Sequence, residues 1–194
     1  MQRELLEIQD IASVLDKRRA GEVLEIEIGC GNGHFLAEYC EKRRDRLLLG
    51  IDRKKGRCLK AVKKVNHSRL SNVFILYGRA EELIEVLADS TVRAYHIYFP
   101  DPWPKNRHRR RRFFRMEHLR SLYRSLEPGG SIYFCSDFHD YYLQAKVLLA
   151  LHGGFSLGEV PPSDEVFRSL FSRRLMAMGK TIYFTAGCKQ SREA

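Results

Sequence analysis

The chain has 194 residues, of which 44% are hydrophobic, and this suits one globular domain with a single core. It contains no run of about 18 apolar residues and no secretory h-region, so we expect no membrane partner and a cytoplasmic location. Lys and Arg number 34 against 24 Asp and Glu, and the net charge of +10 favours a polyanionic partner, with nucleic acid first. Five scattered cysteines without a CxxC pair argue against a disulfide framework and against a zinc site.

The predicted elements alternate along the chain. Residues 1–20 carry apolar side chains at helical spacing and predict an N-terminal helical extension. Residues 21–194 alternate short apolar runs with amphipathic segments, which predicts a single α/β domain. We expect a doubly wound, mostly parallel seven-stranded sheet with helices on both faces. The predicted strands are 23–29, 46–52, 72–78, 94–100, 131–137, 181–187 and a weaker one near 155, and the predicted helices are 34–44, 54–66, 81–87, 115–126 and 138–151.

A glycine-rich turn, EIGCGNG, follows the first predicted strand, and Gly29, Gly31 and Gly33 allow a close backbone approach to a ligand. Its G-x-G-x-G spacing differs from the dinucleotide pattern. The next strand ends at Asp52, about 20 residues on, where an acid accepts hydrogen bonds from a ribose diol. Glu27, at the end of the first strand, would repel pyrophosphate and suit a cationic ligand such as S-adenosylmethionine. The alternative for Glu27 is a capping or surface carboxylate.

Four segments, EIGCGNGHFL, GID, FPDPWPKNRHRRRR and LEPGGSIYFCSD, resemble the bacterial tRNA (guanine-N7)-methyltransferases over roughly Glu22 to Tyr183. The third segment is the specific part, because the glycine turn alone would indicate only a class I methyltransferase. The resemblance implies a Rossmann-like class I methyltransferase fold with S-adenosyl-L-methionine as cofactor. It also implies methyl transfer to N7 of a guanine in the variable loop of tRNA, which forms 7-methylguanosine.

Asp101 follows the predicted strand 94–100. Guanine N7 has an in-plane lone pair and no proton, so its methylation needs no strong base, whereas a carboxylate stabilises the charge left on the base. The resemblance makes Asp101 the catalytic or cofactor-contacting acid and makes Lys105 an RNA contact. Trp103 either packs beneath this loop or stacks on a base.

An arginine-rich run follows directly. Arginine forks pair bidentately with phosphates, so a run beside the predicted catalytic loop favours a tRNA-binding segment over a merely solvated surface. Its members are Arg107, His108, Arg109, Arg110, Arg111 and Arg112.

Two further positions follow predicted strands. Asp137 ends the strand 131–137, and the resemblance makes it a substrate-binding acid for the N1–H and N2–H donors of guanine. The neighbouring Asp140 has a weaker claim, since it fits the first turn of the next helix. Arg79 stands where the family often has Asp or Asn against the adenine of the cofactor, so we expect a backbone contact or a stacked guanidinium there.

One part of the family pattern is altered near the C-terminus. Its T-x-x-E tetrad corresponds to Ser169 and Ser172, which are the predicted substrate contacts, and Ser172 cannot supply the carboxylate. Either another acid such as Glu165 substitutes for it, or guanine is held more weakly.

Two alternatives remain open. One is a class I methyltransferase acting on another RNA base, although the PDPW segment lacks the second proline of the pattern typical of amine methylation. The other is a non-catalytic RNA-binding relative, supported by Ser172 and opposed by the intact glycine turn and acids. The glycine spacing disfavours a dehydrogenase. We expect a monomer or homodimer without bound metal.

Overall fold

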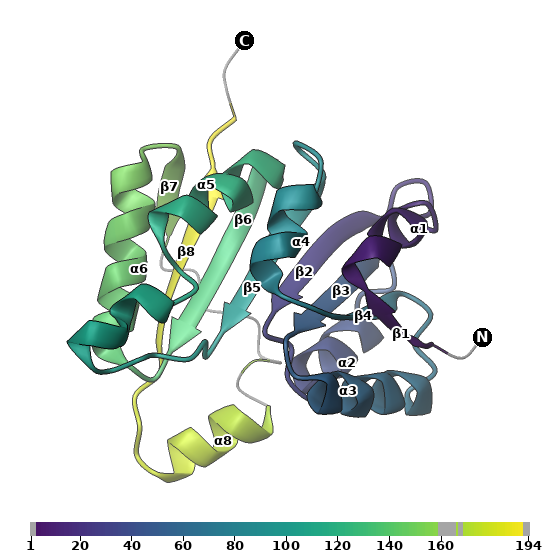
Figure 1. Cartoon of the computed structure of the whole chain (residues 1–194), viewed down its shortest axis with the longest axis horizontal. Coiled ribbons are helices and arrows are strands. Elements are labelled where there is room, and N and C mark those ends of the chain that lie inside the picture. Colours follow the sequence, from purple (N-terminus) through teal and green to yellow (C-terminus); the bar gives the residue numbers. More distant parts are fainter. Residues whose placement is uncertain (1–2, 159–165, 167–168, 192–194) are drawn as a thin grey trace. The chain divides into compact units, whose positions relative to one another are not determined.

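The computed structural model describes residues 3–158, 166 and 169–191. The chain forms two compact units, Met1–Leu87 and Ala88–Ala194, whose strands and helices are shown in Figure 1. None of the helices in the described ranges combines the length and the apolar character needed to cross a bilayer.

The first unit is built on parallel strands in the order β1-β4-β3-β2. A helix follows each of the last three strands along the chain, and α3 packs on β1, β3 and β4. The central strands are buried throughout much of their length, as expected for parallel strands covered on both faces. The strands are β1 (Leu5–Glu7), β2 (Val23–Ile28), β3 (Arg46–Asp52) and β4 (Val73–Tyr77), and the helices are α2 (His34–Glu41), α3 (Lys55–His67) and α4 (Ala80–Val86).

The N-terminal segment differs from the prediction of a helix over residues 1–20. It forms β1, the 3-10 turn η1 (Ile8–Asp10) and the short helix α1 (Ile11–Leu15). Residues 5–7 pair in parallel with residues 75–77 of β4. Covering the edge of β4 satisfies main-chain groups that an open edge would leave unpaired, and this outweighs the helical spacing of the apolar residues. The additional strand makes eight in the described chain, where seven were predicted.

The second unit combines parallel and antiparallel pairing. Strands β5 and β6 are parallel, and β8 pairs antiparallel with both β6 and β7. Helix α6 packs on β6, β7 and β8, and α5 packs on α6. The elements are β5 (Val92–Tyr98), η2 (Asn106–Arg111), α5 (Met116–Ser125), β6 (Leu126–Ser136), α6 (His139–His152), β7 (Phe155–Gly158), α8 (Leu170–Ala177) and β8 (Tyr183–Lys189).

Three features of this unit were not predicted. The Pro128-Gly129-Gly130 segment ends helix α5 as expected but already belongs to β6, and Gly129 has a left-handed φ of +74°. The pairing register between β5 and β6 shifts at this irregular start. The other two features are the 3-10 helix η2 and the helix α8.

Gly33 controls how closely α2 approaches α3. It precedes α2 with a φ of +70°, and a Cβ atom at this position would lie 2.9 Å from the Cβ of Ala61. The absence of a side chain therefore allows the two helices to pack together.

We expect Gly33→Ala to lower the free energy of unfolding by about 1–3 kcal/mol, because left-handed strain adds to overpacking. Urea unfolding measures the change. Gly56→Ala in α3 is the matched control, since an added Cβ there meets no atom within 4 Å. It should be neutral or stabilising by up to about 1 kcal/mol. Equal destabilisation by both substitutions would contradict the close-packing role of Gly33.

Candidate functional site

The glycine turn of the first unit closes over the end of β3. Gly29 and Gly31 adopt left-handed φ values of +78° and +55°. The Gly29 N–H donates to the carbonyl of Ile51 at 2.8 Å, and the Gly31 N–H donates to the carboxylate of Asp52 at 3.1 Å. The structure therefore brings the predicted turn and the predicted acid into direct contact.

Asp52 is buried at the carboxyl end of β3. Its second oxygen accepts a hydrogen bond from the Lys54 N–H at 2.8 Å. Each carboxylate oxygen can accept a further bond, so the two main-chain donors orient Asp52 and leave it able to bind a ligand diol.

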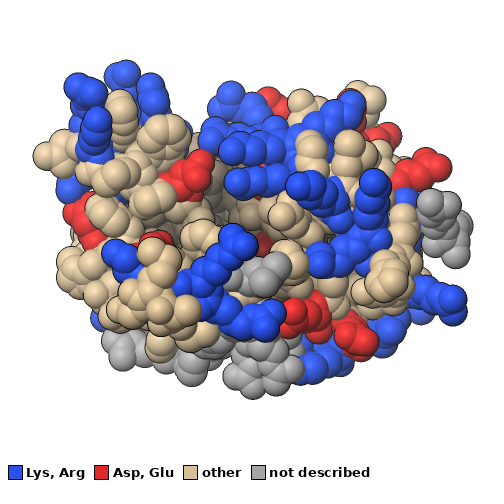
Figure 2. Space-filling view, turned by 90° about the horizontal axis from the view of Figure 1, so that it is seen from below, with Lys and Arg blue, Asp and Glu red and all other residues tan. Residues whose placement is uncertain are grey.

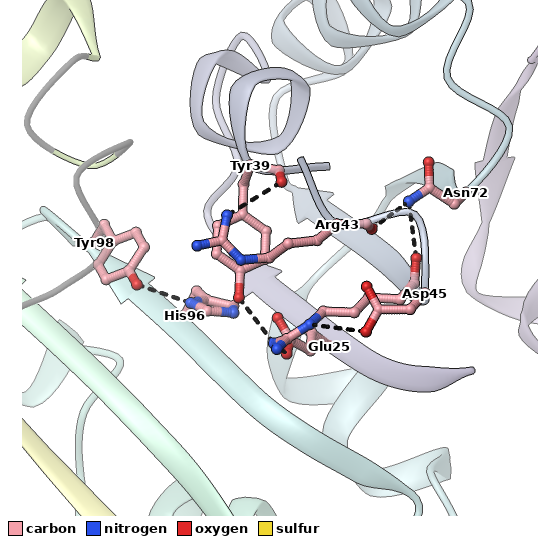
Figure 3. Close-up of polar contacts among 8 residues, drawn as sticks. Glu25, Tyr39, Arg43, Asp45, Asn72, His96 and Tyr98 are labelled. Carbon is pink, nitrogen blue, oxygen red and sulfur yellow. Dashed lines mark hydrogen bonds and ion pairs between the residues drawn. The ribbon is translucent and has the colours of Figure 1, made fainter. Parts of the chain in front are cut away.

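Two glutamates on β2 have different surroundings. Glu25 and Glu27 are two residues apart, so they lie on the same face of the strand, and both are buried. Glu25 forms an ion pair with Arg46, which also donates to the Tyr39 hydroxyl at 3.1 Å; Figure 3 labels Glu25 and Tyr39 within this network. For Glu27, in contrast, no described residue donates a hydrogen bond to Oε2.

The electrostatics of Glu27 follow from this difference. Burial, reinforced by the charge of Asp52, raises the pKa of Glu27 to about 8. An ionised carboxylate is costly in such a place unless a cation joins it. The unpartnered oxygen fits the predicted contact with the cationic part of S-adenosylmethionine.

Arg79 lies directly before α4, close to the end of β3. The Gly78 N–H donates to the main-chain carbonyl of Asp52 at 3.2 Å. The Arg79 guanidinium is exposed and lies 3.7 Å from Glu81 and 3.9 Å from Glu82. Because these acids hold the side chain on its own helix, the predicted cofactor contact of Arg79 fits its backbone better than its guanidinium.

The loop after β5 carries Asp101, which is exposed. Phe99 and Trp103, on either side of it, have left-handed φ values of +50° and +42°. Each precedes a proline, whose ring disfavours the right-handed helical conformation of the residue before it. Lys105 is exposed at the start of η2. The predicted catalytic acid therefore lies in a conformationally constrained loop.

A 3-10 helix has three residues per turn, so side chains three residues apart lie on the same edge. The side chains of the arginine run in η2 therefore lie on three different edges. His108 and Arg111 lie against Trp103, with ring centroids 5.8 Å apart and the guanidinium 5.0 Å from the ring centroid. Trp103 thus packs on η2. Arg107 and Arg110 share another edge and are exposed, and among the described residues neither side chain has a partner.

Arg109 and Arg112 share the third edge and bind Asp140 at 2.8 and 2.7 Å. The prediction that Arg112 contacts RNA does not fit its position. Its side chain is 0% exposed, whereas that of Arg109 is 49% exposed. It also donates to the carbonyl of Pro102 and to Oε1 of Gln144, and is left with no surface for a phosphate.

Of the remaining predicted substrate residues, Asp137 lies where a substrate contact is expected, whereas Ser169 and Ser172 form a helix cap. Asp137 is half-buried directly after β6. Ser169 caps α8 by accepting the Ser172 N–H at 3.2 Å, and the buried Ser172 hydroxyl donates to the Val166 carbonyl at 2.6 Å. This pair is a helix cap, which does not fit the predicted substrate contact of Ser172. Glu165 lies outside the described residues.

Among the residues that the structure describes, no group of three or more His, Cys, Asp or Glu side chains is arranged to hold a metal ion.

Comparisons with known proteins agree with this arrangement. A family model described as "Putative methyltransferase" matches residues 21–168. A tRNA (guanine-N(7)-)-methyltransferase of Syntrophotalea carbinolica is 34% identical over 180 residues, covering 90% of this chain and 76% of that protein. A protein of the same name from Nitrosococcus oceani is 33% identical over 168 residues, covering 86% and 70%.

Solved structures are similar in fold. The 16S rRNA methyltransferase KamB aligns with a TM-score of 0.68 at 16% identity, covering 98% of this chain and 100% of that one. A SAM-dependent methyltransferase from Aquifex aeolicus aligns with a TM-score of 0.58 at 17% identity, covering 93% and 88%.

The strands, the glycine turn against Asp52 and these neighbours define a Rossmann-like, S-adenosylmethionine-dependent methyltransferase. The predicted fold class and cofactor are thus confirmed. The chain belongs to the family of the bacterial tRNA (guanine-N7)-methyltransferases, as the resemblance implied.

The surroundings of Glu27 predict that cofactor binding releases a proton. Below its pKa of about 8 the carboxyl group is mostly protonated in the free protein, and a bound cation ionises it. Calorimetry at about pH 7, in buffers of different ionisation enthalpy, should detect this proton. Glu27→Gln should release none and bind the cofactor roughly 10- to 100-fold more weakly. The same proton count in both proteins would assign the release to another group.

The same group predicts a pH effect on the free protein. The folded-state pKa of Glu27 is raised above its ordinary 4.5, so its contribution to stability is fully present below about pH 4.5 and is lost as the pH rises through about 8. Thermal unfolding above pH 8 should therefore show Glu27→Gln to be more stable than the wild type. A parallel decline of the two proteins with pH would contradict burial as the cause.

Proposed function

We propose that this chain transfers a methyl group from S-adenosylmethionine to N7 of a guanine in tRNA, in the variable loop, and so forms 7-methylguanosine. One observation carries the proposal. This chain, which belongs to the family, exposes Asp101 after β5, and a helix with exposed arginines begins five residues later. The test is to incubate the protein with unmodified tRNA and labelled cofactor and to identify the methylated atom by nucleoside analysis.

The chemistry places few demands on the side chains. S-adenosylmethionine supplies a methyl group on a sulfonium, and the carbon–sulfur bond breaks, with its electrons passing to sulfur, as the N7 lone pair bonds to carbon. No side chain has to remove a proton. The Asp101 carboxylate stabilises the positive charge that develops on the base. Glu27 and Asp52 would hold the cationic and ribose parts of the cofactor, and Asp137 would accept the N1–H and N2–H of guanine.

The alternatives have less support. The relatives are named for guanine N7 in tRNA, which disfavours another RNA base. The Glu27 Oε2 atom, which has no described donor, and the contact of Gly31 with Asp52 favour cofactor binding over a non-catalytic relative. A cytoplasmic location belongs to the same proposal, because tRNA is the substrate. A monomer or homodimer remains a prediction.

The exposed edge of η2 is the part of the arginine run best suited to RNA phosphates. Arg107 and Arg110 have no partner among the described residues, so binding a phosphate would break no existing contact of theirs. Arg109 and Arg111, in contrast, already contact Asp140 and Trp103. Many Lys and Arg side chains are exposed in the space-filling view of Figure 2, as expected for a chain with a net charge of +10. Such contacts position RNA without reading its sequence.

Asp101→Asn should lower kcat roughly 100- to 1,000-fold, since the amide cannot neutralise charge on the methylated base. The affinities for tRNA and for the cofactor should change little. Single-turnover methylation and separate binding titrations measure these quantities. Unchanged turnover would remove Asp101 from the reaction, and lost cofactor affinity with normal chemistry would give it the cofactor role alone.

Replacing both Arg107 and Arg110 by Gln should weaken tRNA binding and reduce the slope of log affinity against log salt by about 0.7–0.9 per residue. Filter binding over a salt series measures the slope. Arg120→Gln, at an exposed arginine of α5, is the control and should leave the slope unchanged. If the double variant keeps the wild-type slope, this edge does not contact phosphates.

A further inference from the structure

The arginine run contains one guanidinium that is enclosed by protein. Arg112 is the largest fully buried side chain of the described residues. Taking a charge out of water is costly, so a buried guanidinium remains stable only with an anionic partner and satisfied N–H donors. The acceptors that Arg112 binds therefore indicate which parts of the chain its side chain connects.

Each part of the Arg112 guanidinium has a separate acceptor. Nε donates to the carbonyl of Pro102 at 2.8 Å, Nη1 to Oε1 of Gln144 at 2.6 Å, and Nη2 to Oδ2 of Asp140 at 2.7 Å. Its carbon Cζ also lies 4.7 Å from the ring centroid of Tyr141. The side chain thus joins the main chain of the Asp101 loop to helix α6.

Helix α6 also fixes the other end of the run. The Phe114 N–H donates to the hydroxyl of Tyr141 at 2.9 Å, and Nε2 of Gln144 donates to the Phe114 carbonyl at 3.0 Å. Consequently, α6 anchors the chain both at residue 102, through Arg112, and at residue 114. The exposed helix η2 lies between these two anchors.

The anchored loop has an unfavourable backbone conformation. Phe99 and Trp103 both have positive φ values, which side-chain-bearing residues adopt rarely and keep only when surrounding contacts enforce them. The Pro102 carbonyl that Arg112 binds lies between Asp101 and Trp103. A planar guanidinium with fixed donor directions suits this task, whereas a lysine would provide only a point charge.

We infer that Arg112 is a positioning residue for methyl transfer: held by Asp140 and Gln144, it fixes the Pro102 carbonyl and thereby the placement of Asp101. It does not touch RNA. The inference deepens the proposed function and rests on it for its kinetic part, because Asp101 is the acid that it positions. Misplacing a reacting group by about 1 Å can cost roughly 100-fold in rate.

The test compares Arg112→Lys with Arg120→Lys, two substitutions that preserve net charge. Trp103 is the only tryptophan of the chain and lies in the loop, so its quenching by acrylamide reports loop order in the absence of any substrate. Arg112→Lys should raise the quenching constant and lower kcat about 10- to 100-fold at saturating tRNA and cofactor. Its tRNA affinity, salt slope and cofactor affinity should match the wild type. The exposed Arg120→Lys should match the wild type in every measurement.

Two outcomes would overturn the inference. One is Arg112→Lys with wild-type quenching and turnover. The other is a loss of tRNA affinity with unchanged kcat, which would make Arg112 an RNA contact. If Arg112→Lys does not fold, Asp140→Ala serves instead, because it removes the anionic partner at a side chain that is 42% exposed. Should the wild type itself not methylate tRNA, the proposed function fails, and quenching still decides whether Arg112 orders the loop.

Discussion

An ion that is taken out of water must be neutralised, and this constraint distinguishes the buried charges that the fold satisfies from the one that it does not. Glu25 is paired with Arg46, and Arg112 is paired with Asp140, so these charges are satisfied within the fold. Glu27 lies on the same strand as Glu25 and is equally buried, but its Oε2 has no described donor. Burial without a cationic partner, together with the charge of Asp52, raises the pKa of Glu27. A cationic ligand would supply the missing charge.

The positions of the other acids follow from parallel strands. Such a strand delivers the residue after it to the carboxyl edge of its sheet, where ligands bind in open α/β folds. Asp52 ends β3 in the first unit, and Asp101 and Asp137 come shortly after β5 and β6 in the second. The buried runs of these strands are legible in the sequence, and so the acids at their ends were predictable. The contact between Gly31 and Asp52 requires the turn geometry and could only be seen in the structure.

Three predictions did not fit the structure because tertiary contacts outweighed a local pattern. Residues 5–7 have a helical apolar spacing but pair with the edge of β4. The resemblance assigns Ser172 to substrate binding, yet its hydroxyl is satisfied within the cap of α8. Arg112 is one arginine among several in the sequence, and nothing in its neighbours along the chain reveals Gln144 and Asp140, which come from a helix about 30 residues further on. If the run had been predicted to form a 3-10 helix, its three-residue period would have placed Arg109 and Arg112 on the same edge. The sequence pattern contains no signal for a 3-10 helix at these residues.

That period explains how one short run can serve two purposes. With three residues per turn, each edge of η2 presents side chains three apart to a single environment. One edge meets Trp103, one meets Asp140, and the third, with Arg107 and Arg110, meets solvent. The first two edges fasten η2 to the loop and to α6, so the third edge can present its charges without having to hold the helix in place. The paired arginines therefore hold the loop and η2 in one arrangement, whereas the phosphate contacts that we propose come only from the exposed edge.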